Sequence, residues 1–247
     1  MERQSTMEYE KIVQRIKESP VMLVGIGAEF QIDADAIGAE PDSLEYAERI
    51  CRLADTENGY SILKPYVEGY RTLKRLIEGK DYFIVSTNTD GMLEHMDFPA
   101  ERTVSPCGSV YRMQCENTEH GVWSIETAWR EGRPLTCPVC AREGRLNIIK
   151  NKPYNESGYL KQWEAYTKWL QRTINKEIFI LELGEGFETP TVMRWPFEKI
   201  VYINQKAAFA RVNSRLPQIS EEIKERAFSV KENSLQFMGR IAELLNS

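Results

Sequence analysis

The feature that most constrains this chain is an alternation of short apolar runs with amphipathic segments. Residues 21–24, 82–85, 178–183 and 199–203 have the length and composition of buried strands. Apolar residues recur at helical spacing over ranges 7–18, 44–53, 65–79, 159–174 and 235–245. Strands that alternate with helices form parallel βαβ units, so we expect an α/β fold, with a Rossmann-like parallel sheet that carries helices on both faces.

Residues 107–157 break this alternation, because they combine cysteine, glycine, proline and asparagine with little periodicity. We interpret them as part of a small inserted module that is helical and cysteine-bearing, similar to a zinc ribbon. The predicted Rossmann-like domain comprises residues 1–40, 80–106 and 158–247. The predicted small helical and zinc-type module comprises residues 41–79 and 107–157.

The charge balance excludes several classes of protein. The net charge is −5, whereas a nucleic-acid-binding surface needs concentrated Lys and Arg to displace counterions. No apolar run reaches the roughly 18–20 residues that span a bilayer, and the charged N-terminal residues do not form a secretory signal. We therefore expect a cytoplasmic protein that binds neither nucleic acid nor membrane.

Glycine-rich or polar segments follow the predicted strands, at the edge where ligands bind in open parallel sheets. Two glycines after the first strand would let backbone N–H groups approach a diphosphate closely. The alternative for each segment is an ordinary turn or a helix cap. The segments are Gly25-Ile26-Gly27-Ala28-Glu29, Ser86-Thr87-Asn88-Thr89-Asp90-Gly91, Leu181-Glu182-Leu183-Gly184-Glu185-Gly186 and Tyr202-Ile203-Asn204.

Four of the five cysteines lie within one segment, while Cys51 stands alone in an apolar stretch and is expected to be a small buried residue. Clustered cysteines in a chain that does not need disulfides indicate metal binding or site chemistry. The four are Cys107, Cys115, Cys137 and Cys140.

Taken in order, these segments resemble the motifs of the sirtuin family, and the resemblance extends over about residues 20–232. Its most specific parts are Ser86–Gly91 and Cys137-Pro138-Val139-Cys140. The stretch from Leu181 to Phe197 is similar to divergent bacterial sirtuins, a group that includes a macrodomain-linked, ADP-ribosylating branch. The further matching segments are Gly25–Gly27, Cys107-Gly108, Gly108–Tyr111, Gly184–Gly186 and Ile203-Asn204.

The resemblance implies that NAD is a substrate, cleaved at the nicotinamide–ribose bond. Asn88 would position the reacting water or ribose, and Asp90 would orient the nicotinamide carboxamide. The implied cofactor-binding set comprises Gly25, Gly27, Ala28 and Glu29 near the diphosphate, Thr87, Asn88 and Asp90, and Gly184, Glu185 and Asn204 on the adenosine half.

Cys107 stands where the family has its general base, a histidine. A histidine with a pKa of about 6.5 accepts a proton at neutral pH, whereas a thiol near 8.5 is mostly protonated. Losing a positioned base typically removes roughly 10²–10⁴-fold in rate. Cys107 would act catalytically only as a thiolate, and the alternative is a small, partly buried residue. The family's segment that covers the nicotinamide ribose also lacks a counterpart in residues 30–35.

The metal site departs from the family as well. Cys115, Cys137 and Cys140 match three of the four cysteine ligands, but Thr118 replaces the other. His120 is the candidate fourth ligand, which would give a Cys₃His zinc site. A degenerate site without zinc is the alternative.

These observations favour an NAD-binding, sirtuin-like enzyme. Its chemistry would be protein ADP-ribosyl transfer, NAD hydrolysis or weak deacylation, and a protein is a candidate substrate. The alternative is a non-catalytic module that senses NAD or ADP-ribose. A Rossmann dehydrogenase is disfavoured, because Phe30 stands where Gly-x-Gly-x-x-Gly needs its third glycine.

Overall fold

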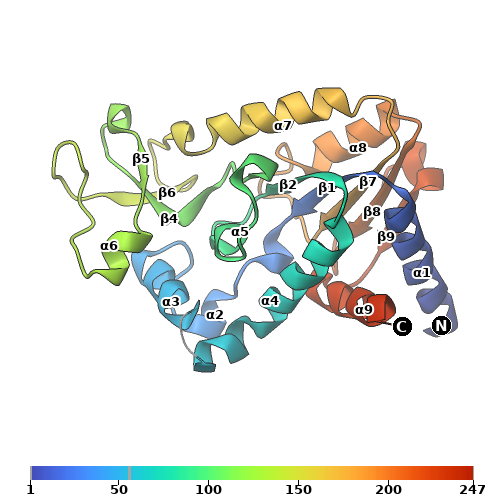
Figure 1. Ribbon diagram of the computed structural model, residues 1–247, viewed down its shortest axis with the longest axis horizontal. Helices are drawn as coiled ribbons and strands as arrows, with labels where there is room; N and C mark the ends of the chain where they lie inside the picture. The colour runs from blue at the N-terminus through green and yellow to red at the C-terminus, as the bar shows by residue number, and fades with distance from the viewer. Residues whose placement is uncertain (1, 55–56, 247) are drawn as a thin grey trace. The chain divides into compact units, whose positions relative to one another are not determined.

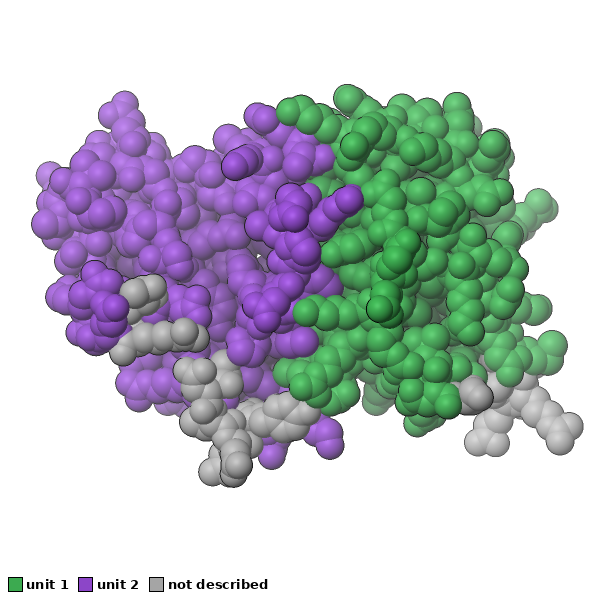
Figure 2. Space-filling model, viewed as in Figure 1, with its two compact units in different colours: residues 1–30, 65–86, 166–247 green, residues 31–64, 87–165 purple. Residues whose placement is uncertain are grey.

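The computed structural model describes residues 2–54 and 57–246. The chain divides into two compact units (Figure 2). Unit 1 comprises Met1–Phe30, Pro65–Ser86 and Tyr166–Ser247, and unit 2 comprises Gln31–Lys64 and Thr87–Ala165. Among the described residues, no helix combines the length and apolar character that crossing a bilayer requires.

Unit 1 is built on parallel strands that lie in the order β2-β1-β7-β8-β9. The strands are β1 (Val21–Ile26), β2 (Asp81–Ser86), β7 (Ile178–Leu183), β8 (Ala207–Val212) and β9 (Ala227–Val230). Every residue of β1, β7 and β8 is buried, which a parallel sheet covered on both faces requires. The predicted α/β fold with a parallel sheet is confirmed.

Helices pack on both faces of this sheet. Figure 1 shows α7 (Leu160–Arg172) and α8 (Arg194–Ile203) on one side, and α1 (Glu2–Glu18) and α9 (Ser234–Asn246) on the other. The Trp169 ring of α7 lies 5.8 Å from the Phe83 ring of β2, and its Nε1 donates to Asp81 at 2.8 Å. On the opposite face, Tyr9 of α1 packs against Phe237 of α9.

The predicted strand over residues 199–203 is wrong, because these residues form the end of α8. Phe197 and Val201 are buried four residues apart, whereas Tyr202 and Ile203 are 59% and 63% exposed. That distribution is the pattern of an amphipathic helix. Pro196 lies in the first turn, where a missing N–H costs nothing.

Unit 2 contains an antiparallel sheet in the order β5-β4-β6, formed by β4 (Gly108–Gln114), β5 (Val122–Ser124) and β6 (Arg145–Ile148). The inserted cysteine-bearing module is therefore confirmed, and it has more regular structure than its sequence indicated. The other elements of this unit are α2 (Ala34–Ile37), α3 (Leu44–Ala54), α5 (Met92–His95), α6 (Glu126–Arg130), β3 (Thr103–Val104), η2 (Ala100–Arg102), η3 (Thr118–His120) and η4 (Glu156–Gly158).

Helix α4 (Glu57–Ile77) is longer than the predicted helix over 65–79, and it runs from unit 2 into unit 1. Gly79, with φ of 72°, follows its end, as a left-handed helix stop requires. Two short 3₁₀ turns, η1 (Ala28–Phe30) and η5 (Glu221–Arg226), complete unit 1.

Candidate functional site

The carboxyl ends of three strands of unit 1 lie side by side. The backbone N–H of Gly27 donates to Leu183 O at 2.8 Å, and that of Gly184 donates to Val212 O at 2.8 Å. One strand further along, the N–H of Asn213 donates to Val230 O at 3.0 Å. The loops that follow β1, β7 and β8 therefore form one continuous edge, where parallel sheets bind ligands.

The glycines of this edge allow the loops to approach one another closely. A Cβ on Gly27 would lie 2.4 Å from Glu185 Cα, and a Cβ on Gly184 would lie 2.4 Å from Glu29 Cβ. Gly184 also has a φ of 71°, which L side chains rarely adopt. Both positions need glycine for loop packing, whatever they bind.

Gly25 lies within β1 rather than in the loop that follows it. A Cβ at this position would lie 2.6 Å from both Met193 Sδ and Phe197 Cε2. Gly25 is therefore the point at which α8 packs closely on the sheet, which is a structural reason for glycine there. Ala28, the next predicted diphosphate contact along the chain after Gly27, is exposed at the start of η1.

Glu29 joins the loops at this edge. Its Oε1 accepts from the N–H and hydroxyl of Ser214 at 2.8 and 2.5 Å. Its Oε2 accepts from the N–H and hydroxyl of Ser234 at 2.8 and 2.7 Å. The carboxylate thus links η1 to the loop after β8 and to the first turn of α9, where a negative charge at a helix N-terminus is favourable.

Glu185 is buried beside Gly27. Only 2% of the residue is exposed, and its Oε2 lies 2.5 Å from the point that a Cβ on Gly27 would occupy. Its carbonyl accepts from Asn213 Nδ2 at 2.9 Å and from Arg194 at 3.1 Å. Both the backbone and the side chain of Glu185 therefore belong to the edge formed by the three loops.

The structure places Asn204 away from this edge. It ends α8 and precedes β8, so it lies at the amino end of that strand. Its side chain donates to Lys176 O at 2.9 Å and accepts from the Lys206 N–H. Asn213, which follows Val212 at the carboxyl end of β8, occupies the kind of position that the sequence predicted for Asn204.

Behind the edge is a buried ion network that the sequence did not reveal. The Arg211 guanidinium binds both carboxylate oxygens of Glu182, at 2.5 and 3.0 Å, and it also bonds Glu198. Arg194 donates to the Glu185 and Leu216 carbonyls and lies 3.6 Å from Glu182. The network fixes α8 and both adjoining loops to strands β7 and β8.

In unit 2, the segment after β2 is held by a set of short hydrogen bonds. Asn88, Thr89 and Asp90 are buried, and Thr87 is half-buried. The Thr89 N–H donates to Gln31 Oε1 at 2.9 Å, and Tyr46 donates to Ile32 O at 2.8 Å. The first bond holds Gln31 against the segment that contains Asn88, and the second holds Ile32 against α3.

Asp90 is the most buried carboxylate of this segment, with 1% exposed. Its Oδ2 accepts from the Ile32 N–H at 2.9 Å and its Oδ1 from the Met92 N–H at 3.0 Å. Burial raises the pKa of Asp90 to about 7, although both hydrogen bonds act in the opposite direction. Asp90 therefore titrates near neutral pH and can donate or accept a proton there.

Cys107 is 3% exposed, immediately before β4. Its carbonyl accepts from the Ile149 N–H at 2.8 Å, and burial together with the Cys107 thiol raises the pKa of Tyr154. The chain has two histidines. His95 is exposed on α5, and His120 belongs to the cysteine cluster. Neither of them stands beside Cys107 in the sequence.

The four predicted metal ligands come together. One ligand atom from each of Cys115, His120, Cys137 and Cys140 lies within 4.8 Å of the others. The Cys115 and Cys140 sulfurs are 3.6 Å apart, and Cys137 Sγ is 3.4 Å from His120 Nδ1. Sulfur ligands at about 2.3 Å from a tetrahedral zinc are about 3.8 Å apart, so the cluster has the dimensions of a metal site.

The electrostatics differ between two cysteines of the cluster, and only that of Cys137 favours the thiolate that binds a metal. Burial would raise the pKa of the Cys137 thiol, but the N–H groups of Cys140 and Val139 lower it to about 6. Burial raises the pKa of the Cys115 thiol. The loop that carries His120 is fixed by Asn155, whose Nδ2 donates to Thr118 O at 2.8 Å.

Comparison with known proteins gives two sequence relatives, and no family model matches the chain. The chain is 24% identical over 185 residues to a "Protein ADP-ribosyltransferase" of Staphylococcus aureus, which covers 69% of this chain and 59% of that protein. It is 26% identical over 164 residues to a "Probable bifunctional ADP-ribose hydrolase/ADP-ribosyltransferase" of Fusarium oxysporum f. sp. cubense, covering 58% of this chain and 26% of that protein. The chain thus matches less than two thirds of the length of either relative.

Solved structures resemble the whole chain. A Sir2 enzyme structure matches with a TM-score of 0.56 and 14% identity over 97% of this chain and 98% of that one. Sir2Af2 bound to a myristoylated histone peptide matches with a TM-score of 0.53 and 12% identity over 96% of both chains. The chain therefore has the fold of the Sir2 enzymes, which confirms the predicted resemblance to the sirtuin family at the level of the fold.

Proposed function

We propose that this chain binds NAD, cleaves the nicotinamide–ribose bond and transfers the ADP-ribose to a protein acceptor. The observation that carries the proposal is the edge formed by Gly27, Gly184 and Asn213 on a Sir2-like sheet. Open parallel sheets bind nucleotides beyond the carboxyl ends of their strands, which is where the loops that begin with these residues lie. The names of both sequence relatives include ADP-ribosyltransferase, which supports the same chemistry.

In the proposed reaction the bond from the ribose carbon to the nicotinamide nitrogen breaks, and the electron pair leaves with nicotinamide. A nucleophilic atom of the acceptor forms the new bond to that carbon and loses its proton. Positive charge develops on the ribose in between, so buried acceptor and carboxylate groups stabilise the transition state. Asn88 and Asp90 are the residues that we assign to this half of the site.

The residue at position 107 favours transfer or hydrolysis over deacylation. An ordinary thiol, with a pKa of about 8.5, is mostly protonated at neutral pH, and deacylation in the family relies on a histidine at this position. Cleavage of the nicotinamide bond needs charge stabilisation more than it needs a base. We therefore propose ADP-ribosyl transfer first, NAD hydrolysis when no acceptor is present, and deacylation at most as a weak activity.

We also propose that Cys115, His120, Cys137 and Cys140 bind one structural Zn²⁺. Three thiols and one imidazole are the soft and borderline donors that zinc prefers in closed tetrahedral sites. The short distances among their ligand atoms support this assignment. When bound, the metal would stabilise the module and take no part in the reaction.

A second candidate function is the sensing of NAD or ADP-ribose without turnover. The loop Gly184-Glu185-Gly186 motivates it, since the buried Glu185 carboxylate beside Gly27 changes the hydrogen bonding that the loop offers to a nucleotide. Calorimetry separates the two functions. Saturable binding of ADP-ribose without nicotinamide release supports the sensor, and absence of binding by NAD and ADP-ribose contradicts both.

The transfer itself is tested with NAD labelled in its adenine half. We expect label to become covalently attached to acceptor proteins, and nicotinamide to be released in equal amount. Release without attachment identifies an NAD hydrolase. No release and no attachment would contradict the proposal.

A further inference from the structure

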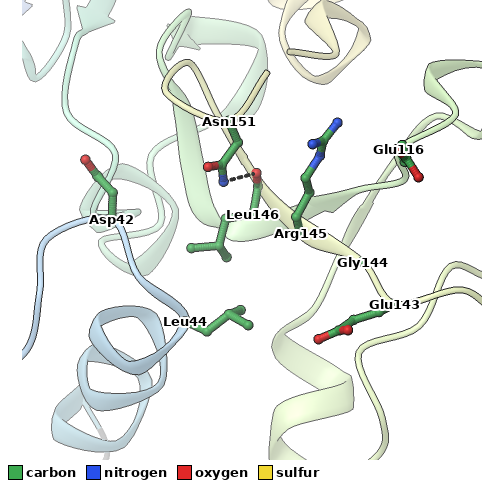
Figure 3. A pocket seen from close by; sticks show the side chains of 8 residues that line it. All are labelled: Asp42, Leu44, Glu116, Glu143, Gly144, Arg145, Leu146 and Asn151. Atoms are coloured by element: carbon green, nitrogen blue, oxygen red, sulfur yellow. Dashed lines mark hydrogen bonds between the residues drawn. The ribbon is translucent and has the colours of Figure 1, made fainter. Parts of the chain in front are cut away.

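Unit 2 contains a cavity of about 410 Å³ that lies between the start of α3 and strand β6 (Figure 3). None of the four metal-ligand candidates lines it. Leu44, which is 41% exposed, and the buried Leu146 contribute its apolar surface. Its volume falls in the range of about 300–1,000 Å³ that is typical of small-ligand clefts.

The charges around this cavity do not balance. Three carboxylates and one guanidinium line it, and the guanidinium of Arg145 already donates to the carbonyls of Lys152 and Pro153. Asp42 accepts from Thr89 at 2.5 Å and pairs with Lys150 at 2.6 Å. The guanidinium of Arg145 is therefore already hydrogen-bonded to carbonyl oxygens.

Glu116 and Glu143 are the two remaining carboxylates. Both are exposed, and neither forms a hydrogen bond or ion pair with its side chain in the part of the chain that the structure describes. Asn151 donates its Nδ2 to Leu146 O at 2.9 Å, as the dashed line in Figure 3 shows, and this leaves its Oδ1 as an acceptor. The cavity thus offers acceptors and negative charge beside apolar carbon.

We propose that this cavity binds a basic side chain, lysine or arginine, of a polypeptide partner. The alkyl stem of such a side chain would pack on Leu44 and Leu146 while its charged head meets Glu116 and Glu143. An anionic ligand would face two uncompensated carboxylates, and a purely apolar one would desolvate them. The exposed pair of Lys150 with Asp42 is an example, within the chain, of the same kind of contact.

The proposal concerns unit 2 alone, and its test contains no NAD. The result of the test is therefore independent of the proposed enzyme activity. The probe is a labelled peptide with one central lysine, and its control has norleucine in place of the lysine. Binding is measured by fluorescence anisotropy, and its place is located by NMR shift changes at the amides of Gly144 and Leu146. We expect saturable binding of the lysine peptide that weakens as salt concentration rises.

Replacing both carboxylates, Glu116→Gln with Glu143→Gln, should weaken binding of the lysine peptide about tenfold, because two exposed ion pairs are lost. The matched control is Glu101→Gln, an exposed carboxylate of the same unit outside the cavity, which should leave the affinity unchanged. Metal content is measured for each variant, since Glu116 adjoins Cys115. Equal binding of the norleucine peptide, an equal loss in the control variant, or no binding at all would overturn the proposal.

Discussion

Arg211 is a single residue on which the order of the strand-end loops depends. It is 1% exposed and it satisfies both oxygens of Glu182, which is fully buried. It also donates to the Gln218 carbonyl at 2.6 Å. A change at this position therefore affects strand β7, helix α8 and the segment before η5 together.

Arg211→Met is expected to lower the free energy of unfolding by about 3–5 kcal/mol, because it leaves a buried carboxylate without its partner. Urea unfolding followed by circular dichroism measures the change. Lys224→Met is the control, since its ion pair with Glu221 is exposed and should contribute little. A loss for Arg211→Met as small as that of the control would show that Glu182 is not held by this pair.

Asp90 makes the free energy of unfolding depend on pH, and its raised pKa determines the direction of that dependence. Its pKa is about 7 in the folded chain, raised from 3.8 by burial. Between these values the folded state holds a proton that the unfolded state has lost. The contribution of Asp90 to stability is therefore fully present below about pH 4 and is lost as the pH rises through 7.

The measurement compares the free energy of unfolding of the native chain with that of Asp90→Asn at pH 5 and pH 8. All other titrating groups are shared, so the difference isolates Asp90. We expect the native chain to lose stability relative to the variant between the two pH values. A difference that does not change with pH would be inconsistent with the raised pKa.

Among the elements, α8 depends on a close approach to β1 at Gly25. A methyl group there would meet Met193 and Phe197 at 2.6 Å, so Gly25→Ala should push the helix outward and cost about 1–3 kcal/mol. If Gly25 acts through packing alone, the affinity of the folded variant for NAD stays within about twofold of that of the native chain. Thermal unfolding and calorimetry test both parts, and an unchanged stability with a lost affinity would contradict this account.

The β5-β4-β6 sheet is the element that the metal would stabilise. We expect one zinc per chain, and its removal by a chelator should raise hydrogen exchange around Cys115 and Cys137 while β1 and β7 stay protected. Cys137→Ser should have the same effect without a chelator. A chain that contains no zinc, or whose exchange is unchanged by chelation, would show that the cluster is structural without metal.

The strands that the sequence predicted correctly are those made mostly of large apolar residues. Ile178–Leu183 and residues 82–85 are examples, since few other structures bury such short runs. Strand β8 was missed because Ala207–Val212 contains three alanines and an arginine, which have low strand propensity. Residues 199–203 were wrongly predicted as a strand, because β-branched residues at the end of a helix have the composition of a strand.

The candidate site was predictable where chemistry depends on residue type within a short segment. Three cysteines and one histidine were recognisable as candidate ligands from their types, and the polar run around Asn88 follows a clear strand. The roles of Glu29 and Arg211 depend on partners as far as 205 and 29 residues away along the chain. No local sequence pattern predicts such pairs. The position of Asn213 at the carboxyl end of a strand could not be predicted either, because strand β8 itself was missed.

At the scale of the whole molecule, the residues assigned to the proposed chemistry are distributed over both units of the chain. Gly27, Gly184 and Asn213 belong to unit 1, while Asn88 and Asp90 belong to unit 2. An intact chain is therefore the proper material for any activity test. The central proposal is that this Sir2-like fold cleaves NAD with Cys107 at the position where, by the resemblance, sirtuins have a histidine.

The most direct test of that claim is nicotinamide release from NAD by the purified chain, compared with Asn88→Ala. Asn246→Ala, at the exposed end of α9, is the matched control. We predict steady release by the native chain and by the control, and a loss of about 10²-fold or more in Asn88→Ala, the scale on which one positioned group stabilises a transition state. Release no greater than that of Asn88→Ala, with all three proteins folded, would contradict the claim.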